Sequence, residues 1–117
     1  MFCARLINQK DVNMLNICDS DILGKTLTRD KFTLKITENF YGKNNIEKEE
    51  AKELLKKCNS INMVGKEIIS LSVNMGIGSQ KGVKEIDGVP FLIVYKVWNI
   101  TIIYKNLQFF LWVSVRS

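Results

Sequence analysis

The sequence predicts an α+β domain in which a helical hairpin packs on a mostly antiparallel sheet. Phe2 to Asn8 and Val12 to Cys18 flank a polar turn, which is typical of an antiparallel hairpin. Lys31 to Thr37 alternates between apolar and polar residues, as a strand with one buried face does. Two later segments repeat apolar residues at helical spacing, which indicates amphipathic helices.

Length and composition fit one small globular domain. The chain has 117 residues, of which 46% are hydrophobic and 25% charged, so it can bury a core and is not of a disordered or fibrous class. We expect a single α+β domain over residues 1–97. Residues 98–117 are mostly apolar and are expected to form an extension, either as additional strands or as an aberrant tail.

The Lys31 to Thr37 strand has two distinct faces. Phe32, Leu34 and Ile36 share one face, which we expect to be buried. Lys31 and Lys35 share the other face, which we expect to meet solvent. One dry and one wet face suit an antiparallel sheet.

The first helix is expected from about Ile46 to Cys58, with Asn45 as its N-cap. The second helix is expected from about Met63 to Met75, with Gly76 as the stop. Asn59 to Asn62 would then form a short connection, so that the two helices pack as a hairpin.

The segments Val83 to Ile86 and Phe91 to Val97 are expected to form strands on either side of an Asp87-Gly88 turn. Pro90 lacks a backbone N–H, so it fits only a sheet edge or the start of a strand.

The residues give no reason to expect a metal or another cofactor. Cys3, Cys18 and Cys58 are widely spaced and the chain has no histidine, so it cannot supply the four ligands of a structural zinc site. The cysteines are expected to be small buried apolar residues, which fits a reducing compartment. Asp19 and Asp21 are too few carboxylates for calcium and are expected in turns and caps.

Two glycine-containing segments resemble parts of nucleotide-binding loops. Gly24-Lys25-Thr26 copies the end of a phosphate-binding loop, but Asp19 stands where the pattern needs a glycine. Gly76-Ile77-Gly78 follows a predicted helix instead of a strand, unlike a dinucleotide fingerprint. No nucleophile or acid–base pattern stands out, so whether the protein is an enzyme stays open, with a binding role favoured.

We expect no membrane segment, because Lys96 and Lys105 interrupt the apolar C-terminal third and the start of the chain lacks a signal-peptide pattern. A cytoplasmic location is expected.

Charge favours anionic partners, since 17 Lys and Arg face 12 Asp and Glu. The densest basic neighbourhood, with one nearby aromatic residue, gives the candidate nucleic-acid-binding set: Lys25, Arg29, Lys31, Lys35, Lys43 and Tyr41. Lysines on a sheet face beside aromatics can contact an RNA backbone and stack on bases. The alternative is a solubilising face whose aromatic neighbours belong to the core.

Several segments occur in an order found in one known family. They are Met1-Phe2-Cys3, Cys18-Asp19 through Leu23-Gly24-Lys25-Thr26, Phe40-Tyr41-Gly42, the helix Glu49 to Lys57, Asn62-Met63-Val64-Gly65 and Gly88-Val89-Pro90. In this order they resemble the archaeal family called domain of unknown function 424, over about residues 1–97.

The resemblance implies a small cytoplasmic α+β protein and a role near RNA or the ribosome in archaeal translation. Family members tend to carry a histidine and a glutamine after Gly-Val-Pro, whereas Phe91-Leu92-Ile93-Val94 follows here. The leading hypothesis is an RNA- or ribonucleoprotein-associated module, with RNA or a ribosomal particle as partner. A protein–protein adaptor without nucleic acid is the alternative, and a small enzyme comes third.

Overall fold

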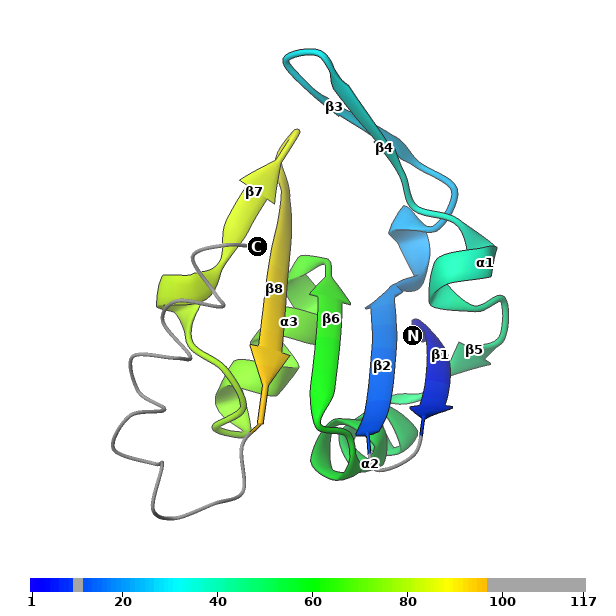
Figure 1. Cartoon of the computed structure of the whole chain (residues 1–117), viewed down its shortest axis with the longest axis vertical. Coiled ribbons are helices and arrows are strands. Elements are labelled where there is room, and N and C mark those ends of the chain that lie inside the picture. Colours follow the sequence, from blue (N-terminus) through cyan, green and yellow to red (C-terminus); the bar gives the residue numbers. More distant parts are fainter. Residues whose placement is uncertain (10–11, 97–117) are drawn as a thin grey trace.

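The computed structural model describes residues 1–9 and 12–96 and has an α+β fold (Figure 1). A six-stranded sheet has the order β5-β1-β2-β6-β8-β7, and β3 and β4 form a separate two-stranded ribbon. The strands are β1 (Phe2–Gln9), β2 (Val12–Asp19), β3 (Thr26–Arg29), β4 (Phe32–Lys35), β5 (Asn45–Ile46), β6 (Ser60–Val64), β7 (Lys84–Ile86) and β8 (Val89–Tyr95). The helices are α1 (Glu38–Tyr41), α2 (Lys48–Lys57) and α3 (Lys66–Asn74), with 3-10 turns η1 (Ser20–Ile22) and η2 (Gln80–Gly82).

The sheet is antiparallel except at its centre, where β2 and β6 run parallel. The expected N-terminal hairpin is present as β1 and β2, with Cys3 opposite Cys18. The second hairpin joins β7 and β8 through Asp87 and Gly88, which both have positive φ angles. Pro90 is the second residue of β8, near the strand's start as predicted. The expected fold class is therefore confirmed.

The main core lies between the sheet and the two longer helices, α2 and α3. Along β2, β6 and β8, alternate side chains point to these helices, as the period of a strand requires. Ala51 and Leu55 of α2 and Ile68 of α3 are fully buried against them. Lys96 Nζ donates to the Leu55 and Lys56 carbonyls at 2.5 and 3.0 Å, so it caps the end of α2.

A second cluster lies on the opposite face of the sheet. It contains Cys18, Val64 and Phe91 from the sheet. It also contains Leu27 and Ile36, which lie where the chain enters and leaves the base of the ribbon. Tyr41 of α1 and Ile22 of η1 complete this cover. The ribbon's base is thus anchored in the domain while the rest of the ribbon projects from it (Figure 1).

The connection between the helices differs from the prediction. The sequence predicts a short link at Asn59 to Asn62, but β6 occupies Ser60–Val64 and separates α2 from α3. The predicted start of the second helix at Met63 is wrong, because Gly65 has a φ of 117°, which an α-helix does not allow. The helix begins at Lys66, and the two helices are joined through a central strand.

The start of α2 also differs. Asn45 is the predicted cap of the first helix, but it belongs to β5, and Glu47 is the N-cap. The Asn45 amide oxygen instead accepts hydrogen bonds from Ser20 Oγ at 2.9 Å and Cys3 Sγ at 3.3 Å. These bonds link β5 to β1 and to η1, which follows β2. The predicted glycine stop of the second helix is confirmed, since Gly76 has a φ of 81°.

The helices of the described ranges are too short or too polar to cross a bilayer. The predicted extension at 98–117 lies outside the described residues. The division at residue 97 therefore stays a prediction.

Candidate nucleic-acid interface

The ribbon formed by β3 and β4, residues 25–35, is named the arm here. Its register places Thr26 opposite Lys35, Leu27 opposite Leu34, and Arg29 opposite Phe32. Because directly opposite residues share a face, one face carries Leu27, Leu34, Arg29 and Phe32. The ladder continues into the domain, where Ile36 N donates to the Lys25 carbonyl at 2.9 Å.

The exposure of the apolar arm residues corrects the prediction of a buried face. Ile36 is fully buried and Leu27 nearly so, but Leu34 is 39% exposed and Phe32 is 77% exposed. Apolar alternation therefore identified the strand correctly but not its burial. The reason is that the hairpin leaves the domain after Leu27 and returns only at Ile36, so its outer half has no layer to pack on.

The arm's position is also fixed at its side. Thr28 N donates to Asp87 Oδ2 at 3.2 Å, which links β3 to the turn of the β7–β8 hairpin. At the tip, Asp30 has a φ of 55°, a conformation that Asp tolerates better than most residues. The arm is thus held at its base by apolar packing and along one edge by a hydrogen bond.

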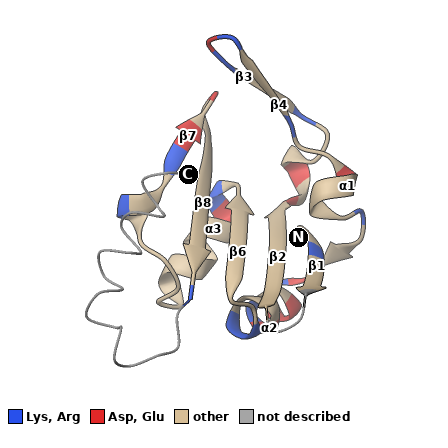
Figure 2. Cartoon of the chain, viewed as in Figure 1, with Lys and Arg blue, Asp and Glu red and all other residues tan. Residues whose placement is uncertain are grey.

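The arm is basic. Lys25, Arg29, Lys31 and Lys35 are all exposed, and Asp30 is the acid between them. Figure 2 shows basic residues at the tip of the arm and farther along it. Four of the predicted binding residues therefore lie on one projecting element.

Lys43 lies outside the arm, in the loop after α1. It lines a cleft of about 600 Å³ together with Arg5 of β1 and Asn39 of α1. Gly42 permits this arrangement, because a β-carbon there would lie 2.2 Å from the Ala4 carbonyl oxygen. The Arg5 guanidinium donates to the Asn39 carbonyl, which holds its side chain at the cleft.

Sequence reasoning missed Arg5, because it is far from Lys43 along the chain. A second cleft of about 370 Å³ at the base of the arm shares Glu38 and Asn39 with the first and is also lined by Lys35. The two clefts share the α1 residues Glu38 and Asn39, so Lys35 borders one cleft while Arg5 and Lys43 border its neighbour.

Tyr41 cannot be a stacking residue in this arrangement. Its side chain is 4% exposed and packs in the second cluster. The pKa of Tyr41 is raised to about 12, mainly because of burial. A hydrogen bond with Asn62 partly offsets this rise. The exposed aromatic side chains near the basic residues are Phe32 and, at 46% exposure, Phe40.

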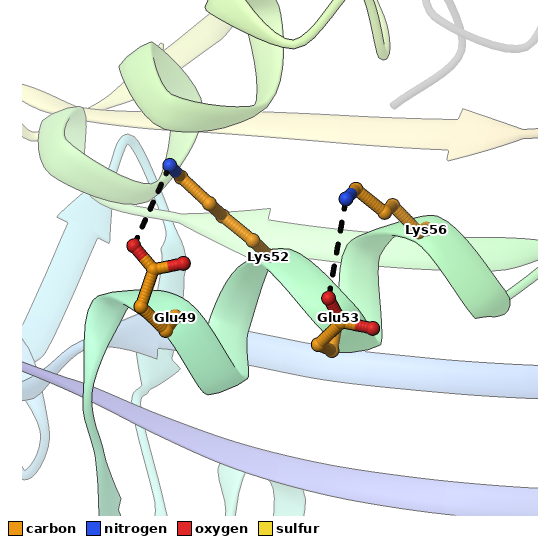
Figure 3. A network of polar contacts seen from close by, with 4 residues as sticks. All are labelled: Glu49, Lys52, Glu53 and Lys56. Carbon is orange, nitrogen blue, oxygen red and sulfur yellow. Dashed lines mark ion pairs between the residues drawn. The ribbon is translucent and has the colours of Figure 1, made fainter.

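The basic residues of α2 have nearby acids, unlike most of those on the arm. Lys52 Nζ lies 3.7 Å from Glu49 Oε1, and Lys56 Nζ lies 3.9 Å from Glu53 Oε1 (Figure 3). These i,i+3 pairs lie at the surface, with Lys52 half-buried, and contribute little to stability, but they offset the helix's positive charge. This face of α2 therefore carries mixed charge.

The remaining candidate groups are structural. Asp19 accepts from Glu67 N at 2.9 Å and Ile68 N at 2.8 Å, so it caps α3 from the end of β2. The cysteines are buried and free, and desolvation raises the pKa of Cys18 to about 12, which disfavours the reactive thiolate. Over the ranges that the structure describes, no cluster of acids and cysteines could hold a metal ion.

The fold and the arm define a small α+β protein with a projecting basic β-ribbon. The chain belongs to the family described as Protein of unknown function (DUF424), whose family model matches residues 7–97. Its fold is similar to the crystal structure of an uncharacterized conserved protein from Methanopyrus kandleri, with a TM-score of 0.69 and 24% identity over 85% of this chain and 96% of that chain. No curated protein matches it.

Proposed function

We propose that this protein is an RNA- or ribonucleoprotein-associated module whose arm contacts RNA. The observation that supports this most is the grouping of Lys25, Arg29, Lys31 and Lys35 on one projecting ribbon with a single acid among them. Cations grouped on one protruding element can reach phosphates that a flat surface cannot. A link to translation is an expectation from the family resemblance.

The two neighbouring clefts beside α1 extend this interface. A backbone that follows the arm toward its base meets Lys35, and beyond Asn39 it meets Arg5 and Lys43. Glu38 is the acid along this path. Phosphate contacts of this kind position a nucleic acid without reading its sequence. We therefore expect binding with little sequence preference.

The test is RNA binding by the full chain at several salt concentrations. Each phosphate contact to a single strand contributes about 0.7 to the slope of log K against log salt. Lys31→Glu with Lys35→Glu should weaken binding and reduce the slope by about 1.4. Lys52→Glu with Lys56→Glu is the matched control, because it changes the same charge on the mixed-charge face of α2. Equal effects of the two double variants would contradict a role of the arm.

A protein–protein adaptor is the second proposal, favoured by the exposed Phe32 and Leu34. Exposed apolar patches mark interfaces. If the wild type binds no RNA at low salt, but Phe32→Ala abolishes capture of one defined protein partner, the adaptor function replaces the RNA function.

A further inference from the structure

We infer that the tip of the arm holds one unpaired base of the RNA, stacked on Phe32 and contacted by Arg29. This inference rests on the proposed RNA function and adds to it the class of nucleic acid, which is single-stranded or looped-out RNA. It gives Phe32 a function that differs from phosphate contact.

The exposure of Phe32 is the first support. At 77% exposed it is the most solvent-accessible large apolar side chain in the described part of the chain, while the core of the same domain is tightly covered. An aromatic ring in water at the end of a basic ribbon contributes little to folding. It offers a flat apolar surface, and stacking on such surfaces is how proteins bind bases without reading their sequence.

The register supplies the second support. Arg29 is the direct partner of Phe32 across the ribbon and shares its face. Side chains in this relationship have β-carbons about 5 Å apart, so a planar base that covers the ring also lies next to the guanidinium. Guanidinium planes stack on bases as aromatic rings do.

The chemistry of this face argues against a duplex. A ribbon that reads a groove needs polar side chains that reach base edges. Arg29, Phe32 and Leu34 are the exposed residues on this face, and only Arg29 carries a hydrogen-bonding side chain, so the face offers a single group to base edges. Base faces inside a duplex are covered by their neighbours, so a ring can stack only on a base that is unpaired or flipped out.

The neighbouring charges suit the same geometry. Lys31 is adjacent to Phe32 in the turn, whereas Lys35 lies farther along the strand and on its other face, opposite Thr26. A nucleotide whose base covers Phe32 would therefore have Lys31 available for a neighbouring phosphate. Asp30, at the outer end of the tip, limits the extent of the site in that direction.

The experiment measures binding of a single-stranded RNA of about ten nucleotides and of the same RNA annealed to its complement. The full chain is compared with Phe32→Ala, Phe32→Leu and Phe32→Tyr. Phe32→Ala and Phe32→Leu should both bind the single strand about 5- to 150-fold more weakly, because both lose the aromatic surface. Phe32→Tyr, which keeps the ring, should bind like the wild type. The wild type should prefer the single strand, and Phe32→Ala should lose that preference.

Arg29→Lys and thermal melting complete the design. Arg29→Lys keeps the charge but loses the plane, so it should weaken single-strand binding while leaving the salt slope unchanged. Melting profiles should match the wild type, since Phe32 buries little.

The outcomes separate this inference from the proposed function. If the lysine double variant loses binding but Phe32→Ala does not, the arm binds phosphates and the stacking inference is wrong. Wild-type affinity of Phe32→Leu would also overturn it, because it would indicate a purely apolar contact such as a protein surface offers. If the wild type binds neither the single-stranded nor the annealed RNA, the stacking inference and the proposed RNA function both fail.

Discussion

A β-carbon at Gly65 would lie 2.4 Å from the carboxylate of Asp19. The two residues stand at the ends of the parallel strands β2 and β6, where the chain enters α3. The absence of a side chain at Gly65 lets the Asp19 carboxylate reach the first N–H groups of the helix. Gly65 thus directly follows the last residue of β6 and leaves room for the Asp19 side chain that caps α3.

Gly65→Ala should destabilise the protein strongly, by more than about 2 kcal/mol, because it adds this collision to the strain of a positive φ. Gly76→Ala is the matched control. Gly76 also has a positive φ, but nothing lies within 4 Å of the place that a methyl group would take there, so this variant should cost about 1 kcal/mol. Urea unfolding of both variants measures the difference, and equal losses would show that the Asp19 contact is not the cause.

Asp19→Asn should change how stability depends on pH. Burial raises the pKa of Asp19 above its usual 3.8, although the Glu67 and Ile68 N–H groups act to lower it. Between 3.8 and the raised pKa the folded protein holds this proton more tightly than the unfolded chain, so stability falls as pH rises through that window. The asparagine variant lacks this contribution.

The free energy of unfolding of the wild type minus that of Asp19→Asn should therefore decrease with pH through this window and then level off. Urea titrations at several acidic pH values would give this difference. A difference that increases with pH would mean that the two backbone hydrogen bonds outweigh burial.

Leu55→Ala and Ile68→Ala should each cost about 2 to 5 kcal/mol, since both side chains are fully buried between the helices and the sheet. Lys56→Ala should stay within about 0.5 kcal/mol, because Lys56 is exposed and its ion pair is weak. Thermal melting can check all three. A small loss at Ile68 would contradict the packing of α3 on the sheet.

Asp87→Gly should release the edge of the arm without disturbing the turn. Glycine accepts the φ of 54° that Asp87 adopts, but it cannot accept the Thr28 N–H. Amide exchange at Thr28 should accelerate by about tenfold at most, as expected for one exposed hydrogen bond. Asp87→Asn keeps an acceptor oxygen and is the control. Unchanged exchange in Asp87→Gly would mean that Thr28 is protected in another way.

A chain that ends at Val97 should fold and be more soluble than the full chain. The family match ends at residue 97, and residues 98–117 are mostly apolar. Melting and size-exclusion profiles of both chains test this. An unfolded or aggregated short chain would place the domain boundary farther along.

Local patterns were sufficient for the β1–β2 and β7–β8 hairpins, because turn residues and alternation act over short stretches. They failed at β6, where Met63 and Val64 fit the helical spacing that Ile68 continues. The positive φ of Gly65 separates strand from helix there. It occurs where Asp19 approaches closely, which is a contact between distant parts of the chain that local patterns do not contain.

The grouping of basic residues on the arm could be predicted from sequence, because most of them are neighbours along the chain. The exposure of Phe32 could not, since alternation identifies a strand whether or not a second layer covers it. Arg5 was missed for another reason: only the folded sheet brings β1 beside the loop that carries Lys43.

The parallel pairing of β2 with β6 has a consequence for the folding pathway. The two terminal hairpins join neighbours in sequence and can form early, whereas this pair joins Met14 to Ser60 and Cys18 to Val64. Closing so long a loop carries an entropic cost before its contacts form. We therefore expect the β1–β2 hairpin to dock on β6 in the rate-limiting step, and side chains at the β2–β6 seam, such as Ile17 and Met63, to govern the folding rate.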